Sequence, residues 1–504
     1  MRGKVYLVGA GPGDPGLFTL RGKVLLERAN CIIYDFLANE ELLRFARAEC
    51  EKIFVGKRAG RHMQTQEQIN SLMVRKARAH ETVVRLKGGD PFIFGRGGEE
   101  AAALAAADIP FEVVPGVSSG SAVPAYAGIP VTHRKIASAV SFRTGHEDVV
   151  LGVSEGATSA PTTPRDNATQ IFMMGARHLP GITQRLIAEG CDPSMPVAVI
   201  RWGTTPAQEV VTGTLEDIAR RARDVPPPTI TVVGNVVRLR ERLRWFEKLP
   251  LFGQRVVITR MEEQAAPLRD ALAERGAEAV GIPSIEIRNP DSWETMDSAI
   301  GRLNEFDYLL VTSVNGVRNF LARLRACELD ARALKGIEIG AIGPATAAEF
   351  ARSGIRVDFV PEDYRAEGLL EVLGKRDLAG KSFLIPRARV ARDLVPRALC
   401  DRGARVEVVP AYSVVPPEYR PEELEALLTP PPSVITFTSS STATNFFQLP
   451  IPPQVRERLA AAKIASLGPI TSATVRELGM KVDIEAEKST IEGLVEAMEA
   501  HFKR

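Results

Sequence analysis

The sequence predicts an α/β protein that is divided into several domains. Short runs rich in Val, Ile and Leu alternate with helix-forming segments along most of the chain, which is typical of α/β folds. The chain has 504 residues, and a single hydrophobic core rarely grows beyond about 250–300 residues. A third observation, a repeat inside the C-terminal half, predicts two similar units there.

The first element is a predicted buried strand that ends in a glycine-rich turn. Residues 5–16 read Val-Tyr-Leu-Val-Gly-Ala-Gly-Pro-Gly-Asp-Pro-Gly, and a helix is expected over residues 19–29. Asp14 stands where a dinucleotide fingerprint has its third glycine, and Val24 follows Lys23 where a phosphate loop needs Ser or Thr. An acidic side chain is unfavourable beside a pyrophosphate at a helix N-terminus. The turn therefore suits a ligand without phosphate groups.

A second strand-to-turn segment occupies residues 85–100. The strand leads into Gly88-Gly89-Asp90-Pro91, and an Ala-rich helix is expected near residues 99–107. Two glycines let a ligand approach the backbone, and Pro91 ends the strand. A turn of this kind is often only a tight connection, so its meaning depends on the segments around it.

Composition and charge exclude several classes of protein. The formal net charge of +2 excludes a generally basic nucleic-acid binder. No apolar run reaches 18 residues, and the first residues lack a charged and apolar leader, so we expect a soluble cytoplasmic protein without a membrane partner. The five cysteines lie far apart and away from histidine clusters, which predicts reduced thiols and no metal site.

The C-terminal half contains an internal repeat with offsets of 125 to 127 residues. The matching positions are Arg260 with Arg387, Pro283 with Pro410, Ser313 with Ser439, and Gly343 with Gly468. Because this period is too long for a solenoid, it predicts two similar α/β units. Thr-Ser and Gly-Pro-x-Thr turns are expected to place Ser or Thr at helix caps. Capping alone explains any single turn, whereas several helix N-termini facing one cleft would form a cradle for anions.

Further motifs extend the pattern of the N-terminal half over about residues 3–247. They are Tyr34-Asp35, residues 55–60 with His62 and Gln66, residues 114–119, 125–134 and 144–146, Met174-Gly175, Gly203-Thr204 and Val233-Gly234. With the two glycine-rich turns, they resemble the uroporphyrinogen-III C-methyltransferase family. The resemblance implies a tetrapyrrole methylase fold of two α/β subdomains, about residues 3–113 and 116–246, and a homodimer through this half. It also implies methylation of uroporphyrinogen III by S-adenosylmethionine at carbons 2 and 7, giving precorrin-2 for siroheme or cobalamin.

The same resemblance carries site residues onto this sequence. It gives Asp35 the base role and Lys57 the proton-donor role. The residues implied for the methyl donor are Pro12, Gly88, Gly89, Asp90, Ile93, Ser118, Ser119, Met174 and Gly203. Candidates to bind the carboxylates of the substrate are Arg58, His62, Arg96, His133 and Arg134. The chain departs from the family pattern at Phe36, where Arg is usual, and at Arg201-Trp202 before Gly203.

The C-terminal half resembles uroporphyrinogen-III synthase over about residues 253–500. The matching elements are residues 312–317, 364–369, 437–440, 468–471 and 490–494, together with Tyr412. The resemblance implies two flavodoxin-like lobes with parallel sheets, residues 254–286 plus 416–504 and residues 288–411. Tyr412, near the hinge, is the candidate catalytic hydroxyl, and the candidate substrate contacts are Arg260, Ser313, Arg387, Ser439 and Thr471.

Together the halves predict a bifunctional enzyme with domains at residues 1–247 and 254–504, joined by a linker at residues 248–253. The synthase would cyclise hydroxymethylbilane to uroporphyrinogen III, which the methyltransferase would then methylate. S-adenosylmethionine is the expected methyl donor, and no metal or redox cofactor is expected. Two alternatives stay open: the C-terminal half could only bind tetrapyrrole, or the methyltransferase could act on another substrate.

Overall fold

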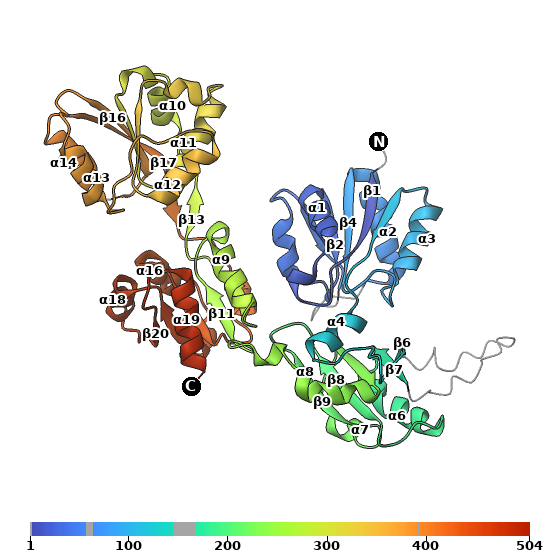
Figure 1. Ribbon diagram of the computed structural model, residues 1–504. Helices are drawn as coiled ribbons and strands as arrows, with labels where there is room; N and C mark the ends of the chain where they lie inside the picture. The colour runs from blue at the N-terminus through green and yellow to red at the C-terminus, as the bar shows by residue number, and fades with distance from the viewer. Residues whose placement is uncertain (1–2, 57–63, 146–166, 392, 504) are drawn as a thin grey trace. The chain divides into compact units, whose positions relative to one another are not determined.

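The computed structural model describes residues 3–56, 64–145, 167–391 and 393–503 (Figure 1). The chain divides into two compact units. The first consists of Met1–Val256, Arg269–Ala279 and Met498–Arg504, and the second of Val257–Leu268 and Val280–Ala497. No helix within the described ranges combines the length and apolarity that a bilayer crossing requires.

The chain begins with a parallel sheet of strand order β3-β2-β4-β1-β5. Its strands are β1 (Lys4–Gly9), β2 (Cys31–Tyr34), β3 (Glu51–Phe54), β4 (Thr82–Lys87) and β5 (Phe111–Val114). Helix α1 (Leu20–Arg28) packs on one face through Leu25 and Leu26, while α2 (Gln66–Ala79) and α3 (Gly97–Ala106) pack on the other (Figure 1). Because all the strands run the same way, the loops that follow β1, β2 and β4 meet at one edge of the sheet.

A second, mixed sheet of order β6-β7-β10-β8-β9 follows. Its strands are β6 (Ala139–Thr144), β7 (Ala168–Met173), β8 (Pro196–Arg201), β9 (Glu209–Thr214) and β10 (Thr229–Val233). Only β6 and β7 pair in parallel, whereas β10 is antiparallel to both β7 and β8. The accompanying helices are α4 (Ser119–Tyr126), α6 (Leu179–Ala188), α7 (Ile218–Arg221) and α8 (Arg240–Leu243). The two α/β subdomains expected in the N-terminal half are therefore present.

The C-terminal half contains two more sheets, of order β12-β11-β18-β19-β20 and β13-β17-β16-β14-β15. The first has β11 (Arg255–Ile258), β12 (Glu278–Gly281), β18 (Val434–Phe437), β19 (Lys463–Ser466) and β20 (Ile484–Glu485). The second has β13 (Glu286–Arg288), β14 (Tyr308–Val311), β15 (Glu338–Ala341), β16 (Ser382–Ala388) and β17 (Arg405–Val415). The helices are α9 (Glu262–Ala273), α10 (Glu294–Ile300), α11 (Val314–Ala326), α12 (Pro344–Arg352), α13 (Ala366–Gly374), α14 (Leu394–Cys400), α15 (Pro421–Leu427), α16 (Ser440–Gln448), α17 (Pro453–Leu459), α18 (Pro469–Glu477) and α19 (Ile491–Phe502).

The sequence repeat corresponds to a repeat of these two sheets. In the repeat, strands β11, β12, β18 and β19 correspond to β16, β17, β14 and β15, respectively. The corresponding strands occur in the same order in the two sheets. The correspondence extends to side chains that the sequence analysis did not match. Asp358 accepts a hydrogen bond from the Ile339 backbone at 2.7 Å, and Asp483 accepts one from the Ile464 backbone at 3.1 Å. The expected two parallel-sheet lobes are confirmed.

The four predicted helix caps divide into two kinds. Ser313 and Ser439 are the N-caps of α11 and α16, and each hydroxyl accepts a backbone hydrogen bond from the third residue of its helix. At α12 and α18 the caps are instead Gly343 and Gly468. The prediction of Thr caps there is wrong, since proline at the first helical position starts each helix and leaves the following Thr buried inside the first turn.

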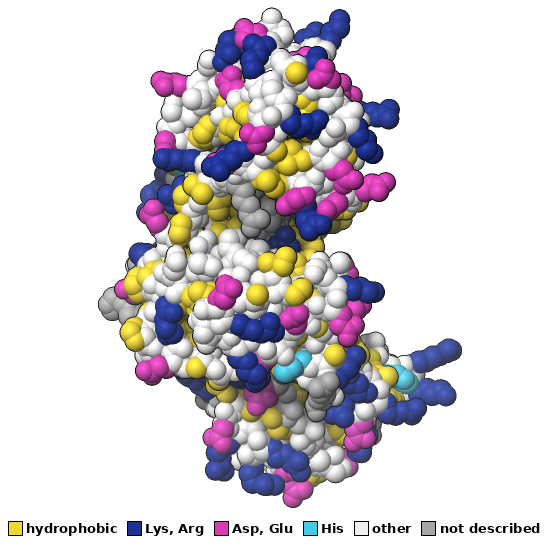
Figure 2. Space-filling model, turned by 90° about the vertical axis from the view of Figure 1, so that its left-hand side faces the viewer, with side chains coloured by type: hydrophobic (Ala, Val, Ile, Leu, Met, Phe, Trp, Pro, Cys, Tyr) yellow, Lys and Arg dark blue, Asp and Glu magenta, His cyan; other side chains and the backbone are white. Residues whose placement is uncertain are grey.

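The predicted linker at residues 248–253 and the domain limits beside it stay predictions. Lys, Arg, Asp and Glu side chains are interspersed on the face of the molecule in Figure 2. This mixture agrees with the balanced formal charge of the chain, +2.

Candidate active site

A cavity of about 930 Å³ lies in the first unit, between the loops of its two sheets. All nine residues that were carried over for the methyl donor line it, as do Asp35 and Arg96. The donor residues are Pro12, Gly88, Gly89, Asp90, Ile93, Ser118, Ser119, Met174 and Gly203. These residues come from positions 12 to 203 of the chain, so the fold brings together motifs that are far apart in sequence.

The wall of the cavity is built by two loops that pair through their backbones. Gly89 donates to the Gly11 carbonyl at 2.7 Å, and Gly11 donates to the Gly89 carbonyl at 3.2 Å. Gly89 has a φ of +67°, which favours glycine. A Cβ atom on Gly88 would lie 2.5 Å from the Cβ of Leu37, so the loop after β2 also closes on this wall. The glycines are therefore required by backbone conformation and by close packing.

Polar groups hold the loops beside these glycines. The Asp90 carboxylate accepts hydrogen bonds from the backbones of Phe92 at 2.8 Å and Gly116 at 3.0 Å. Ser118 is the N-cap of α4 and accepts from the Gly120 backbone at 3.2 Å. Both side chains thus shape the cavity by accepting hydrogen bonds from the backbone of the loops that form its wall. Each side-chain oxygen retains a lone pair for a ligand.

The two departures from the family pattern meet at the cavity. Phe36 and Trp202 both line it, and their ring centroids are 6.0 Å apart with an interplanar angle of 61°. Phe36 is 56% exposed, and Trp202 has a φ of +45°, an uncommon conformation for an aromatic residue. The pair offers an apolar, edge-to-face surface, and at Phe36 this surface replaces the arginine of the family pattern.

Asp35 lies at the carboxyl end of β2 and is held from two sides. Its Oδ1 atom accepts from the Leu37 backbone at 3.2 Å, and its Oδ2 atom accepts from Arg85 Nη2 at 3.2 Å. The side chain is 27% exposed and lines the cavity. Asp35 therefore stabilises the turn after β2 and is also a carboxylate that a ligand can reach.

Three charged residues that the sequence analysis did not select lie behind Asp35. Glu100 Oε1 is 3.1 Å from Arg85 Nε and 2.8 Å from Lys87 Nζ, and all three residues are buried. Burial and, next, the neighbouring Arg85 lower the pKa of Lys87, whereas Glu100 acts in the opposite direction. Alternate positions of β4 carry Arg85 and Lys87, and two cations on one face of an apolar strand are a signal that could have been used.

Of the remaining methyltransferase candidates that the structure describes, one lines the cavity and two do not. Arg96 lines it and forms an ion pair of 2.7 Å with Glu99. His133 and Arg134 are not among its lining residues. Lys57, Arg58 and His62 lie outside the described residues, so their roles stay predictions.

In the C-terminal half, the structure brings Tyr412 and Ser313 together. Tyr412 is 7% exposed and donates from its hydroxyl to Ser313 Oγ at 3.0 Å. The next residue, Ser413, pairs with Arg288 of β13, so Tyr412 adjoins the antiparallel link between strands β13 and β17. Tyr412 also packs within the hydrophobic core of this sheet, and its catalytic role stays a prediction.

The other synthase candidates have mainly local partners. Arg260 Nη2 lies 3.2 Å from Gln264 Oε1, and burial lowers the pKa of the Arg260 guanidinium. Arg387 forms an ion pair with Asp393. Ser439 caps α16 and Thr471 is buried in α18. These contacts leave their substrate roles untested.

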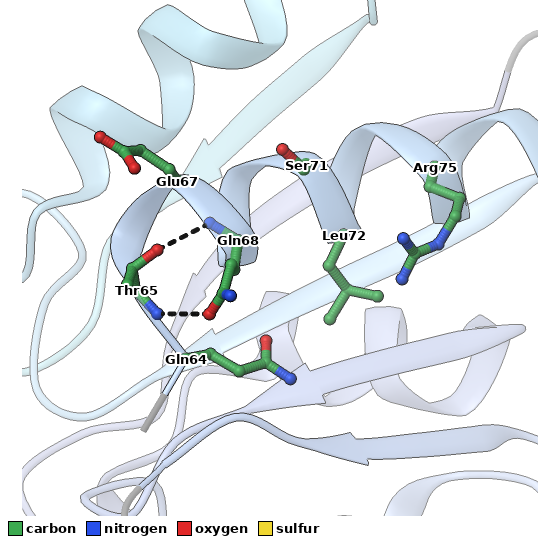
Figure 3. A pocket seen from close by; sticks show the side chains of 7 residues that line it. All are labelled: Gln64, Thr65, Glu67, Gln68, Ser71, Leu72 and Arg75. Atoms are coloured by element: carbon green, nitrogen blue, oxygen red, sulfur yellow. Dashed lines mark hydrogen bonds between the residues drawn. The ribbon is translucent and has the colours of Figure 1, made fainter. Parts of the chain in front are cut away.

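A second cavity, of about 770 Å³, lies along the start of α2 (Figure 3). Figure 3 shows its Thr65–Gln68 capping box, in which each side chain accepts from the other residue's backbone, at 3.3 and 2.9 Å. Its remaining lining residues are Gln64, Glu67, Ser71, Leu72 and Arg75. Among the predicted site residues that the structure describes, none lines this cavity.

One group of possible metal ligands occurs among the described residues. Cys31, Glu51 and His80 place their ligand atoms within 4.8 Å of one another. However, Lys76 Nζ lies 2.6 and 2.8 Å from the two Glu51 carboxylate oxygens, and the pKa of the Cys31 thiol is raised to about 12, mainly by burial. Because a metal needs a thiolate and a free carboxylate, the contacts of this group fit an ion-pair network.

Comparison with known proteins agrees with the two-part organisation. The family model for Tetrapyrrole (Corrin/Porphyrin) Methylases matches residues 4–219, and that for Uroporphyrinogen-III synthase HemD matches residues 266–496. The Porphyrin biosynthesis protein HemD of Ruminiclostridium josui is 35% identical over 501 residues, which are 98% of this chain and 97% of that protein.

Two other relatives cover less of the chain. The Uroporphyrinogen-III C-methyltransferase of Bacillus subtilis (strain 168) is 40% identical over 363 residues, 72% of this chain and 74% of that protein. The S-adenosyl-L-methionine-dependent uroporphyrinogen III methyltransferase of Methanosarcina barkeri is 51% identical over 243 residues, 48% of this chain and 94% of that protein. The resemblances of both halves are confirmed, and the chain belongs to the family of proteins that join a tetrapyrrole methylase to a uroporphyrinogen-III synthase.

Proposed function

We propose that this protein is a bifunctional enzyme of tetrapyrrole biosynthesis. It cyclises hydroxymethylbilane to uroporphyrinogen III with inversion of the last pyrrole, and it methylates that product at carbons 2 and 7 to give precorrin-2. The observation that carries the proposal is the convergence of all nine donor residues and Asp35 on one cavity. Since the synthase product is the methyltransferase substrate, one chain would catalyse consecutive steps.

The cavity has the chemistry that a sulfonium donor requires. Glycine backbones at residues 88–89 permit close approach, Ile93 and Met174 offer apolar contacts, and Asp90 offers an acceptor. When bound, S-adenosylmethionine supplies the methyl group. The residues around it orient the reactants and exclude water, which is what an in-line displacement chiefly needs.

Asp35 is suited to manage charge on the acceptor. Methylation of a pyrrole carbon places positive charge on the ring, which must then lose a proton. A carboxylate stabilises such charge and can accept the proton, and Asp35 reaches the cavity from the end of β2. Arg96 would bind a substrate carboxylate, and the Phe36–Trp202 pair would contact the apolar face of the macrocycle.

In the synthase half, the hydroxyl of Tyr412 is the proposed proton donor. Ring closure begins when the precursor loses a hydroxyl group, which yields a reactive azafulvene. Tyr412 Oη now donates to Ser313 Oγ, which itself accepts from the Gly316 backbone at 3.0 Å. Tyr412 would therefore exchange Ser313 for the departing hydroxyl as its acceptor. A spiro intermediate, implied by the family, would invert the last ring.

Product analysis with the full-length protein tests both activities. Without S-adenosylmethionine, hydroxymethylbilane should yield the III isomer of uroporphyrinogen, identified by chromatography after oxidation. With S-adenosylmethionine, mass spectrometry should detect the addition of two methyl groups. If only the I isomer forms, the C-terminal half does not catalyse inversion, and the alternative in which it only binds tetrapyrrole is favoured. If added uroporphyrinogen III is not methylated, the methyltransferase acts on another substrate.

Replacing Tyr412 with phenylalanine should shift the product toward the I isomer. The linear precursor cyclises unaided to that isomer, so slower enzymatic closure lets the uncatalysed reaction compete. Tyr308→Phe is a matched control because Tyr308 lies in the same sheet and is 6% exposed, compared with 7% for Tyr412. The control should retain the III isomer. Equal isomer ratios for both variants would remove Tyr412 from the mechanism.

A further inference from the structure

We infer that Arg85, Glu100 and Lys87 form a positioning cluster that fixes the Asp35 carboxylate for methyl transfer. The inference rests on the proposed function, in which Asp35 acts on the acceptor. None of the three residues was selected from the sequence motifs. They matter because they connect helix α3, which does not reach the cavity, to the Asp35 carboxylate, which does.

Glu100 is the anchor of the cluster. It lies in α3, has a fully buried side chain, and receives Arg85 Nε at 3.1 Å and Lys87 Nζ at 2.8 Å on a single carboxylate oxygen. Gln66 Nε2 reaches the same oxygen at 3.3 Å. A buried carboxylate is costly unless it is paired and hydrogen-bonded. The two cations of β4 therefore stay on the side of the strand that faces α3.

Arg85 transmits this anchoring to Asp35. Its Nη1 donates to the carbonyls of Ile33 at 3.4 Å and Leu86 at 3.0 Å, while Nε contacts Glu100. With these contacts made, the planar guanidinium has one orientation, and its Nη2 faces Asp35 Oδ2 at 3.2 Å. Since the Leu37 backbone holds the other oxygen, the carboxylate is fixed at both atoms.

A role in stability alone explains this arrangement poorly. Buried ion pairs contribute little net stability compared with apolar residues of similar size. Arg85, Lys87 and Gln66 line the cavity beside Asp35, whereas Glu100 does not. The two cations, Arg85 and Lys87, balance the charges of the two carboxylates of Asp35 and Glu100. Among these four residues Asp35 is open enough to act on a ligand, because its side chain is 27% exposed.

The test compares single and double variants of the full-length protein. Glu100→Gln and Arg85→Lys should lower kcat for uroporphyrinogen III by about 10- to 100-fold, the size of the effect when a hydrogen-bonded partner that orients a metal ligand is removed. The KM for the acceptor and the donor Kd from calorimetry should change little. Added to Asp35→Asn, Glu100→Gln should lower kcat little further, because it acts through the same carboxylate.

Glu112→Gln is the matched control. Glu112 also pairs with one lysine and one arginine, Lys4 and Arg21, each at 2.9 Å, but does not line the cavity. This control should keep wild-type kcat.

Each result decides between the claims. If Asp35→Asn is slow but Glu100→Gln and Arg85→Lys are not, the cluster does not position Asp35 and the proposed function survives. If Asp35→Asn keeps full activity, the proposed role of Asp35 is wrong. An equal loss from Glu100→Gln with and without Asp35, or failure of both cluster variants to fold by circular dichroism, makes the cluster structural and overturns the inference.

Discussion

Replacing Gly89 with valine should abolish binding of S-adenosylmethionine. Gly89 has a φ of +67°, and the nearest atoms to an added Cβ would be Ser119 N at 3.7 Å and Oγ at 3.9 Å. The side chain would therefore not be stopped by a protein clash, but it would stand on the cavity wall in a strained backbone conformation. Strain of this kind lowers the stability of the folded protein by about 1–3 kcal/mol, with or without the donor. The loss of donor binding follows instead from the valine methyl groups, which would occupy the space in which the donor approaches the backbone.

Calorimetry on the folded variant measures this loss, and Gly98→Val is its control. Gly98 lies in the same segment, in the first turn of α3, where an added Cβ would meet no atom within 4 Å. It does not line the cavity, so donor affinity should be unchanged. If Gly89→Val binds the donor as tightly as this control, residues 88–90 do not contact the donor.

The fold of the C-terminal half was predictable because its sequence repeats. Arg260 lies two residues after β11 and Arg387 is the next-to-last residue of β16, and the matching strands occupy equivalent places in their sheets. The repeat could not predict the helix starts at Gly343 and Gly468. A threonine in a turn is a good cap in isolation, but the proline that follows each glycine determines the first helical residue. The antiparallel direction of β13 in its sheet was also not predictable, because it depends on pairing with β17, which is distant in the sequence.

The cavity was predictable to the extent that its residues occur in motifs. Glycines such as Gly89 mark places where the backbone must take an unusual conformation, and they remain visible in one sequence. Glu100 was missed because a glutamate in a helix is usually solvated. Its burial arises only when α3 packs over Arg85 and Lys87. Charge clusters of this kind depend on tertiary packing, so sequence motifs alone do not show them.

Replacing Asp35 with alanine should lower methyl-transfer turnover while donor affinity changes little. The variant removes the carboxylate that faces the acceptor but leaves the glycine-rich wall of the cavity intact. General acid–base groups typically contribute on the order of 100-fold or more to rate, so we expect a loss of that size. A turnover assay with uroporphyrinogen III, beside calorimetry of donor binding, separates the two effects.

The chain offers both a control and a rescue experiment for this variant. Asp224→Asn changes an exposed carboxylate that does not line the cavity, and it should be fully active. In Asp35→Ala, Arg85 Nη2 loses its acceptor and lies next to the vacated space. Because a guanidinium binds carboxylates well, added acetate should restore part of the turnover. Wild-type turnover without acetate would show that Asp35 handles neither charge nor protons in the reaction.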